Sequence, residues 1–129
     1  MIALALAGAV AADAPDFDLF AKAVDKCDRG AVAKTVGASV NRHGRFLIDS
    51  YKEQRAIGQT RIDLSERRRK LRAGEKGADT DAVLNSAEEA LIDRQRVLDD
   101  ERILARAEQD TVAYFRQQYL TQCVGRAVE

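Results

Sequence analysis

Six apolar residues recur at strict seven-residue intervals in the second half of the sequence, and this repeat constrains the fold more than any other feature. They are Leu84, Leu91, Leu98, Ala105, Val112 and Tyr119. Such a repeat forms one apolar stripe along a helix. A parallel set widens the stripe: Val83, Ala90, Val97 and Leu104. We therefore predict one helix from about Asp79 to Cys123.

A shorter repeat precedes it. Ile57, Leu64 and Leu71 are seven residues apart, and Leu47 precedes them on a neighbouring position of the same face. This pattern predicts an amphipathic helix over residues 45–72. Gly74 and Gly77 then interrupt it, and Asp79 or Thr80 can cap the next helix.

Two heptad helices joined by a short glycine loop pack antiparallel. The predicted fold class is therefore all-α: a long, coiled-coil-like antiparallel helical hairpin with its hinge near residues 73–79. Charge supports the pairing, because residues 42–76 are mainly basic and residues 79–110 mainly acidic. If residues equally distant from the hinge face one another, three contacts follow: Arg61 with Glu88 or Glu89, Arg68 with Asp81, and Leu47 with Ile103.

The sequence also predicts an additional N-terminal helix packed at the open end of the hairpin. Pro15 suits a first helical turn, and an apolar set recurs at helical spacing, namely Phe17, Phe20, Val24 and Cys27. Gly30 is predicted to end this helix. Residues 31–44 contain two further glycines, so a short helix and a bend both fit there.

Residues 1–12 are uncharged and apolar, and Ala9-Val10-Ala11 has the small-residue form of a cleavage site. We predict a signal peptide at 1–12, a single helical-hairpin domain at 13–129, and a periplasmic or secreted protein. A positive n-region is missing, so either Met1 is internal to the true signal or the segment remains as a helix start. Twelve residues are too few to span a bilayer, which needs about 20, and no transmembrane segment is predicted.

The only two cysteines, Cys27 and Cys123, lie equally far from the hinge in opposite arms. In an exported protein such a pair is predicted to form a disulfide bond, which here would close the open end. Two buried free thiols in a cytosolic protein, or a redox pair, are the alternatives. The sequence has no C-x-x-C spacing to favour the redox pair.

No catalytic or metal-binding pattern is recognisable. His43 is the lone histidine, is predicted to lie on the surface, and has no partners with metal-ligand spacing. Asp99, Asp100 and Glu101 are adjacent and are predicted to form a solvated face. We therefore predict no enzyme activity, no cofactor and no metal. An enzyme that uses Asp, Glu or Arg alone would need a convergent polar pocket.

A basic cluster next to the hinge is the candidate partner-binding tip. It consists of Arg67, Arg68, Arg69, Lys70 and Arg72. Its targets would be phosphate, anionic lipid or an acidic protein surface. Nucleic acid is not predicted, because the 21 basic residues equal the 21 acidic ones and the tip lacks stacking aromatics. Contact with a membrane surface is allowed by the cluster but supported by nothing else. The aromatic residues Tyr114, Phe115, Tyr119, Phe17 and Phe20 are predicted to form a core at the open end.

These features predict an exported, chaperone- or adaptor-like protein-interaction module that binds a protein partner or forms a homo-oligomer. In outline, with basic residues ahead of a glycine-containing tip, the hairpin resembles the coiled-coil arms of periplasmic holdase chaperones of the OmpH-like class. That resemblance implies a fold only, and the strand-rich body that joins such arms is not predicted here. The alternative is a small secreted, disulfide-clamped inhibitor of a lytic enzyme, which would be monomeric and bind one target.

Overall fold

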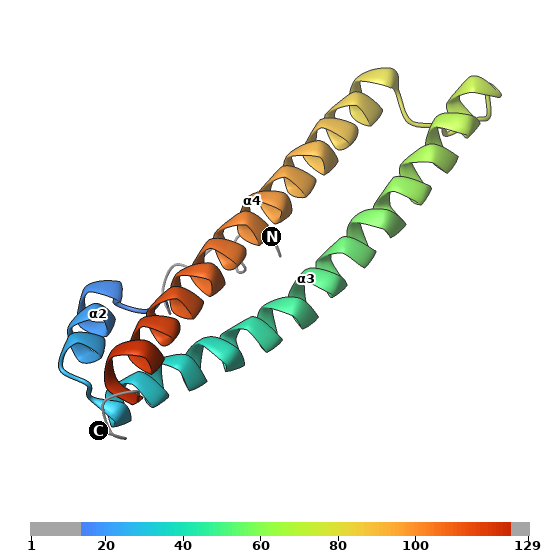
Figure 1. Cartoon of the computed structure of the whole chain (residues 1–129). Helices are drawn as coiled ribbons and strands as arrows, with labels where there is room; N and C mark the ends of the chain where they lie inside the picture. The colour runs from blue at the N-terminus through green and yellow to red at the C-terminus, as the bar shows by residue number, and fades with distance from the viewer. Residues whose placement is uncertain (1–13, 125–129) are drawn as a thin grey trace.

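The chain folds into a long helical hairpin with a short helix at its open end (Figure 1). The computed structural model describes residues 14–124, so the predicted signal segment at 1–12 lies outside the described residues. Helix α2 spans Phe17–Asp25, α3 spans Arg29–Arg72 and α4 spans Asp81–Tyr119. A π-helix, η1, follows at Leu120–Val124. The predicted all-α antiparallel hairpin is confirmed.

Residues 73–80 reverse the chain between α3 and α4. Gly74 and Gly77 have φ angles of +68° and +77°, a region that favours glycine. Thr80 then caps α4, since its side-chain oxygen accepts a hydrogen bond of 3.3 Å from the Val83 backbone N–H. Within residues 14–124, none of the helices is both long and apolar enough to cross a membrane.

The heptad residues nearest the hinge form the first of two apolar clusters, which we call the hinge-side core. Its buried members are Ile57 and Leu64 of α3 with Leu84, Leu91 and Leu98 of α4. Leu71 packs against them while partly buried. The heptad prediction is therefore confirmed in this half of the seam, where burying each large side chain stabilises the fold by roughly 1.5–3 kcal/mol.

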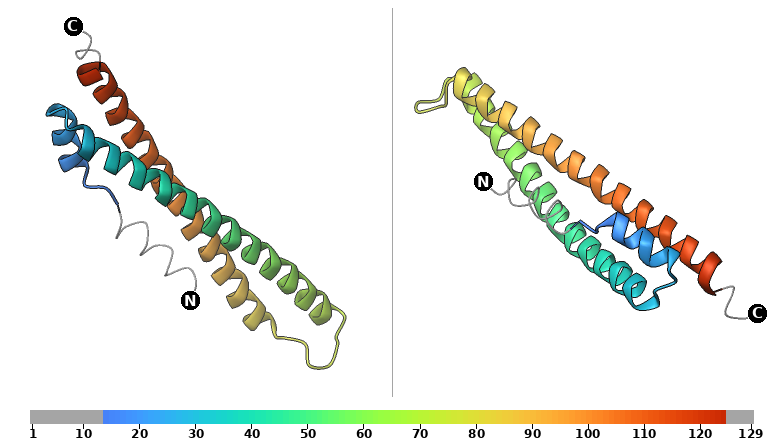
Figure 2. Two further views of the ribbon diagram at one scale, coloured as in Figure 1. Left: turned by 90° about the horizontal axis from the view of Figure 1, so that it is seen from below. Right: turned by 90° about the vertical axis from the view of Figure 1, so that its left-hand side faces the viewer.

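The second cluster, the open-end core, joins all three helices. It contains Phe20 and Val24 of α2, Val32 of α3 and Val112 of α4. Phe115 contacts Phe20 edge to face, with ring centroids 5.4 Å apart. Figure 2 shows α2 lying against both long helices at the end opposite the hinge. Phe17 and Tyr119 also pack there as predicted, whereas Tyr114 is 60% exposed and lies outside this core.

The first arm begins earlier than predicted. Helix α2 ends at Asp25, Cys27 adopts a φ of +53°, and Asp28 caps α3 by accepting from the Ala31 N–H at 3.2 Å. Gly30 therefore lies in the first turn of α3, and its predicted role as a helix stop is wrong. Residues 31–44 form neither a bend nor a separate helix. Packing of Val32 in the open-end core holds this stretch helical despite its glycines.

Several apolar residues predicted to widen the seam face solvent instead. They are Leu47, Val83, Val97 and Leu104, all of which are exposed. A seam between only two helices buries a narrow stripe, so residues beside the heptad positions remain accessible. Of the predicted contacts, Arg68 does pair with Asp81. Glu88 also pairs with Arg68, and Arg61 makes no ion pair in the described part of the chain.

Candidate interaction surfaces

The predicted basic tip occupies the last turns of α3. Arg68 reaches across the hinge to three side chains of α4: Asp81 at 3.1 Å, Asn85 at 2.9 Å and Glu88 at 3.0 Å. These bonds connect the two arms near the hinge and favour one register. Most of the hydrogen-bonding capacity of Arg68 is therefore used inside the hairpin.

Two further arginines of the tip are also paired. The Nε of Arg67 lies 2.7 Å from a carboxylate oxygen of Asp79, and Arg69 lies 2.7 Å from Glu66. Hydrogen bonds from these guanidinium groups lower the pKa of Asp79 and the pKa of Glu66. Among residues 14–124, Lys70 and Arg72 make no ion pair and remain exposed. Partner binding by the tip stays a prediction, and three of its five residues are already engaged within the hairpin: Arg68 with α4, Arg67 with the hinge and Arg69 inside α3.

Between the two cores the seam is polar, and we call this section the polar waist. It contains Ser50, Glu53 and His43 of α3 with Arg94 and Glu101 of α4. Glu53 is buried and accepts hydrogen bonds from two nitrogens of Arg94, one of them at 3.0 Å. This bond raises the pKa of Arg94. Because the two charges are opposite and hydrogen-bonded, their attraction offsets the cost of removing them from water.

Glu101 is the unmatched member of the waist. It is only 6% exposed, and its Oε2 has no hydrogen-bond partner among the described residues. Burial raises the pKa of the Glu101 carboxyl, and the neighbouring Asp100 raises it further. The predicted solvated face of Asp99, Asp100 and Glu101 is therefore wrong at its third member. Glu101 lies three residues after Leu98, which places it on the seam.

His43 also departs from the prediction. It is half-buried, and its Nδ1 is buried without a partner in the described residues. His43 lies seven residues before Ser50 and fourteen before Ile57, so it continues the heptad of the seam. This seven-residue spacing is the sequence signal that could have predicted a seam position for His43.

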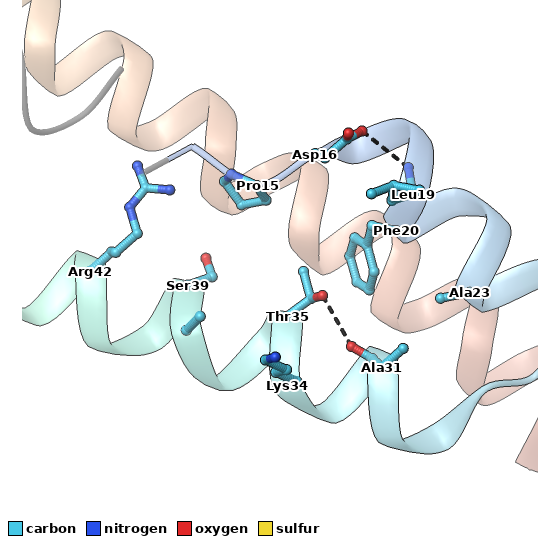
Figure 3. Close-up of a pocket in the computed structure, with 11 residues that line it drawn as sticks. Pro15, Asp16, Leu19, Phe20, Ala23, Ala31, Lys34, Thr35, Ser39 and Arg42 are labelled. Atoms are coloured by element: carbon cyan, nitrogen blue, oxygen red, sulfur yellow. Dashed lines mark hydrogen bonds between the residues drawn. The ribbon is translucent and has the colours of Figure 1, made fainter. Parts of the chain in front are cut away.

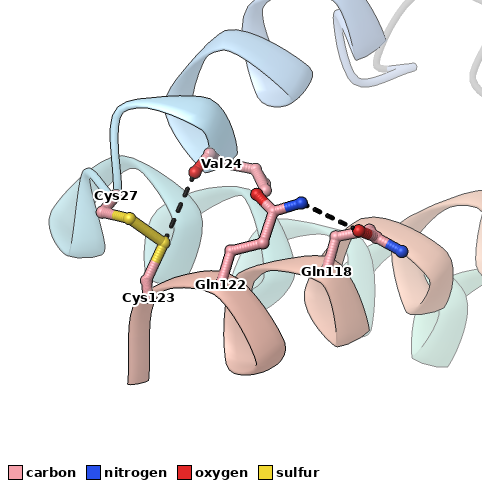
Figure 4. The surroundings of a disulfide bond; sticks show 5 residues. All are labelled: Val24, Cys27, Gln118, Gln122 and Cys123. Atoms are coloured by element: carbon pink, nitrogen blue, oxygen red, sulfur yellow. Dashed lines mark hydrogen bonds between the residues drawn. A yellow bond between two sulfur atoms is a disulfide. The ribbon is translucent and has the colours of Figure 1, made fainter. Parts of the chain in front are cut away.

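Cys27 and Cys123 are joined by a disulfide, with their Cα atoms 5.5 Å apart (Figure 4). The bond links the turn after α2 to η1, as the sequence predicts for the open end. The Sγ of Cys123 lies 3.5 Å from the Val24 carbonyl oxygen. A disulfide sulfur carries no proton, so this is a van der Waals contact and not a hydrogen bond.

A shallow groove of about 310 Å³ runs between α2 and α3 (Figure 3). Its walls are mostly apolar, with Leu19, Phe20 and Ala23 on one side and Ala38 on the other. Arg42 lies at one end and pairs with Glu108 of α4 at 2.7 Å. The polar groups along it are spread over several turns and do not converge on one point. The groove therefore suits apolar contact better than chemistry.

An exposed apolar feature of α3 was missed by sequence reasoning. Five side chains of α3, which we call the α3 stripe, are each more than half exposed: Val40 (64%), Leu47 (53%), Ile48 (57%), Tyr51 (65%) and Ile62 (64%). Their spacing follows the helical repeat, so they lie on one side of α3, away from the seam. Leu47 was assigned to the seam, and that error concealed the stripe.

Within residues 14–124, no three His, Cys, Asp or Glu side chains are placed to hold a metal ion. Comparison with known proteins adds no further constraint on function. No family model matches the chain, and neither a curated protein nor a solved structure matches it.

Proposed function

We propose that this protein is a helical-hairpin interaction module that binds a protein partner through the α3 stripe and catalyses no reaction. The observation that carries the proposal is the exposure of five large apolar side chains along one helix. Contiguous exposed apolar surface of this kind marks interaction sites in proteins. Basic residues line its edges, among them Arg45, Lys52 and Arg55. They favour a partner with an acidic rim.

Binding without turnover is supported by where the carboxylates lie. Glu53 and Glu101 are buried in the seam, where a substrate does not reach them. The exposed acidic residues of α4 all lie on one helix, where adjacent ones point in different directions, so they do not face one another across a cleft. A pair of carboxyl groups that flanks a substrate, as acid–base catalysis requires, is not formed in the described part of the chain.

The proposed place of action is an oxidising compartment outside the cytoplasm. Two observations support it: the disulfide between Cys27 and Cys123, and the uncharged apolar composition of residues 1–12. Disulfides persist where the redox environment is oxidising. The periplasm and the extracellular space both meet this condition.

A chaperone- or adaptor-like role and the inhibitor alternative share the clamped hairpin but differ in what they bind. The α3 stripe favours the first, because an apolar helix face accepts many partners of similar chemistry. Suppressed aggregation of an unfolded test protein, lost in a Leu47→Ser/Tyr51→Ser variant, would support it. Tight one-to-one binding to a single lytic enzyme, without suppressed aggregation, would favour the inhibitor.

The proposal is tested directly by photo-crosslinking in the cell that makes the protein. A photoreactive amino acid replaces Tyr51 in the stripe, or the exposed Asp49 on the opposite side of α3 as the control. We expect a discrete adduct from position 51 and none from position 49, with the adduct identified by mass spectrometry. Equal labelling at both positions, or none at either, would contradict the proposed binding surface.

A further inference from the structure

We propose that the α3 stripe is one half of an interface between two copies of this chain, in which α3 of each copy packs against α4 of the other. This inference rests on the proposed role of the stripe in binding and names its occupant. It is carried by the glycines of α3, by the charges of the two arms, and by the placement of α2.

Four glycines of α3 occur in one seven-residue register: Gly30, Gly37, Gly44 and Gly58, with Tyr51 in the remaining place. A seven-residue register keeps them on nearly the same side of the helix as the α3 stripe. Glycine destabilises a helix interior relative to alanine. A helix with this many glycines on one side is therefore less stable alone than it would be with alanine there.

The hairpin itself gives no reason for three of these glycines. A Cβ atom built at Gly37, Gly44 or Gly58 meets no atom within 4 Å. None of the three has a positive φ. Alanine would thus fit the single copy at each position. What glycine provides here is room for another backbone to approach α3 closely.

The charges select which helix approaches. Helix α3 carries twelve basic and four acidic residues, whereas α4 carries nine acidic and five basic ones. Packing α3 against α3 of a second copy would bring like charges together, and packing it against α4 brings opposite charges together. The outward side of α4 also offers exposed apolar residues, Ile92 at 58% and Ile103 at 67%.

Several charged residues at these two surfaces have no ion-pair partner within residues 14–124, although Asp93 pairs with Arg96 and Asp99 with Arg102 inside α4. Lys52 and Arg55 flank the α3 stripe, and Glu89 and Asp100 lie beside Ile92 and Ile103. By contrast, Asp81 and Glu88 of α4, which face the hinge-side end of α3, are already paired with Arg68. Unpaired opposite charges around two apolar surfaces are the complementarity expected of an interface.

Both surfaces lie on the same broad face of the hairpin. Tyr51 follows the seam residue Ser50 by one position, and Ile92 follows the seam residue Leu91 by one position. In antiparallel helices, equivalent positions beside the seam fall on the same face. Helix α2 lies over the other face, on the side of α3 that carries Ala31 and Thr35 (Figure 3). Two copies can therefore meet face to face about a twofold axis and form a four-helix bundle.

The first test is sedimentation equilibrium of the oxidised full chain. We expect a dimer that dissociates on dilution, and a Gly44→Ala/Gly58→Ala variant whose dissociation constant rises at least about tenfold. The same variant should keep or gain helicity, because alanine favours the helix. Weaker association together with equal or higher helicity would therefore not be explained by a folding defect. Asp49→Asn, exposed on the side of α3 opposite to Tyr51, is the control and should leave the dissociation constant unchanged.

The second test reverses the charges. A Lys52→Glu/Arg55→Glu variant and a Glu89→Lys/Asp100→Lys variant should each be monomeric, because each brings like charges together in both contacts. Mixed in equal amounts, they should form a heterodimer. Restored association on mixing is not expected if either variant has simply lost its fold.

Two results would overturn the inference. One is a wild-type chain that stays monomeric at about 100 µM and low salt. The other is a dimer insensitive to the glycine and charge substitutions. A monomer that still crosslinks another protein through position 51 would keep the proposed function and refute only the dimer. A monomer that instead binds phosphatidylglycerol vesicles through the stripe would assign this face to a membrane surface.

Discussion

The hinge-side core and the polar waist are built from the same two helices and from consecutive heptads of the same seam. In the hinge-side core the heptad positions hold Ile57, Leu64 and Leu91, and all are buried. In the waist the same positions of α3 hold Ser50 and His43, and Glu101 of α4 is buried among them. Periodicity therefore sets the path of the helices, while the residue type at each repeat sets where the stability lies.

The largest expected effect comes from the disulfide on the far side of the waist. Its cysteines are 96 residues apart, so in the chain-entropy model a Cys27→Ser/Cys123→Ser variant loses about 4–5 kcal/mol of unfolding free energy. Hydrogen exchange should then rise most in the waist and in α2, and least around Ile57. Uniform loss of protection would show that the waist is no weaker than the core.

A second pair of cysteine substitutions separates the loss of the disulfide from the backbone strain at Cys27. Cys27 has a φ of +53°, which serine tolerates poorly and glycine tolerates well. A Cys27→Gly/Cys123→Ser variant should therefore be more stable than the double serine variant, by about 1 kcal/mol. Thermal unfolding of the two proteins side by side measures the difference. Equal stability would mean that this turn relaxes once the bond is absent.

Within the hinge-side core, Ile57→Ala should lower the unfolding free energy by about 2–5 kcal/mol, because the side chain is fully buried. Leu91→Ala should act similarly. The matched control is Ile62→Ala, the same substitution five residues later on the same helix at a side chain that is 64% exposed. It should change stability by less than about 0.5 kcal/mol. Similar losses at positions 57 and 62 would contradict the seam assignment.

In the waist, by contrast, substituting Glu101 should raise the unfolding free energy. Glu101→Gln should stabilise the protein at pH 8 by roughly 1–3 kcal/mol, because it removes a buried carboxylate that lacks a partner. The folded-state pKa of Glu101 is raised, so its neutral form stabilises the fold below the ordinary glutamate pKa, and this contribution is lost as pH rises through the raised value.

The advantage of the Gln variant should therefore shrink as the pH falls. Glu66 and Asp79 have lowered pKa values, so their contribution is lost in the opposite direction, as the pH falls through those values. The wild type and the Gln variant share that loss. The difference between their urea midpoints therefore reports the contribution of Glu101 ionisation alone. An advantage that stays constant from pH 8 to pH 3 would refute the role assigned to its ionisation.

The smallest effect is expected at the tip. Arg68→Ala removes three contacts with α4, but partly exposed ion pairs contribute little, and the loss should be about 1 kcal/mol or less. Added salt should reduce it further. A loss as large as that of Ile57→Ala would mean that charge, and not the hinge-side core, holds this half of the hairpin.

The sequence predicted those parts of the molecule that a strong local pattern specifies. The heptads located α4 and the later part of α3, the glycine pair located the hinge, and two cysteines at equal distance from it indicated the disulfide. The early part of α3 was not predictable in this way, because its glycines signal a break, whereas packing of Val32 and Val36 in the open-end core supports a continuous helix. Glu101 was misassigned because its type suggested solvent while its position lay on the seam.

The disulfide also acts as a check on how the two arms align. A heptad repeat is nearly unchanged when one arm slides by seven residues along the other, a displacement of about 10 Å in an α-helix. In that slipped arrangement the Cα atoms of Cys27 and Cys123 could no longer lie within the roughly 4–7 Å that a disulfide requires. Oxidation therefore succeeds only for the correctly aligned hairpin. A chain that carries the disulfide is therefore one whose two arms are in register along the whole seam.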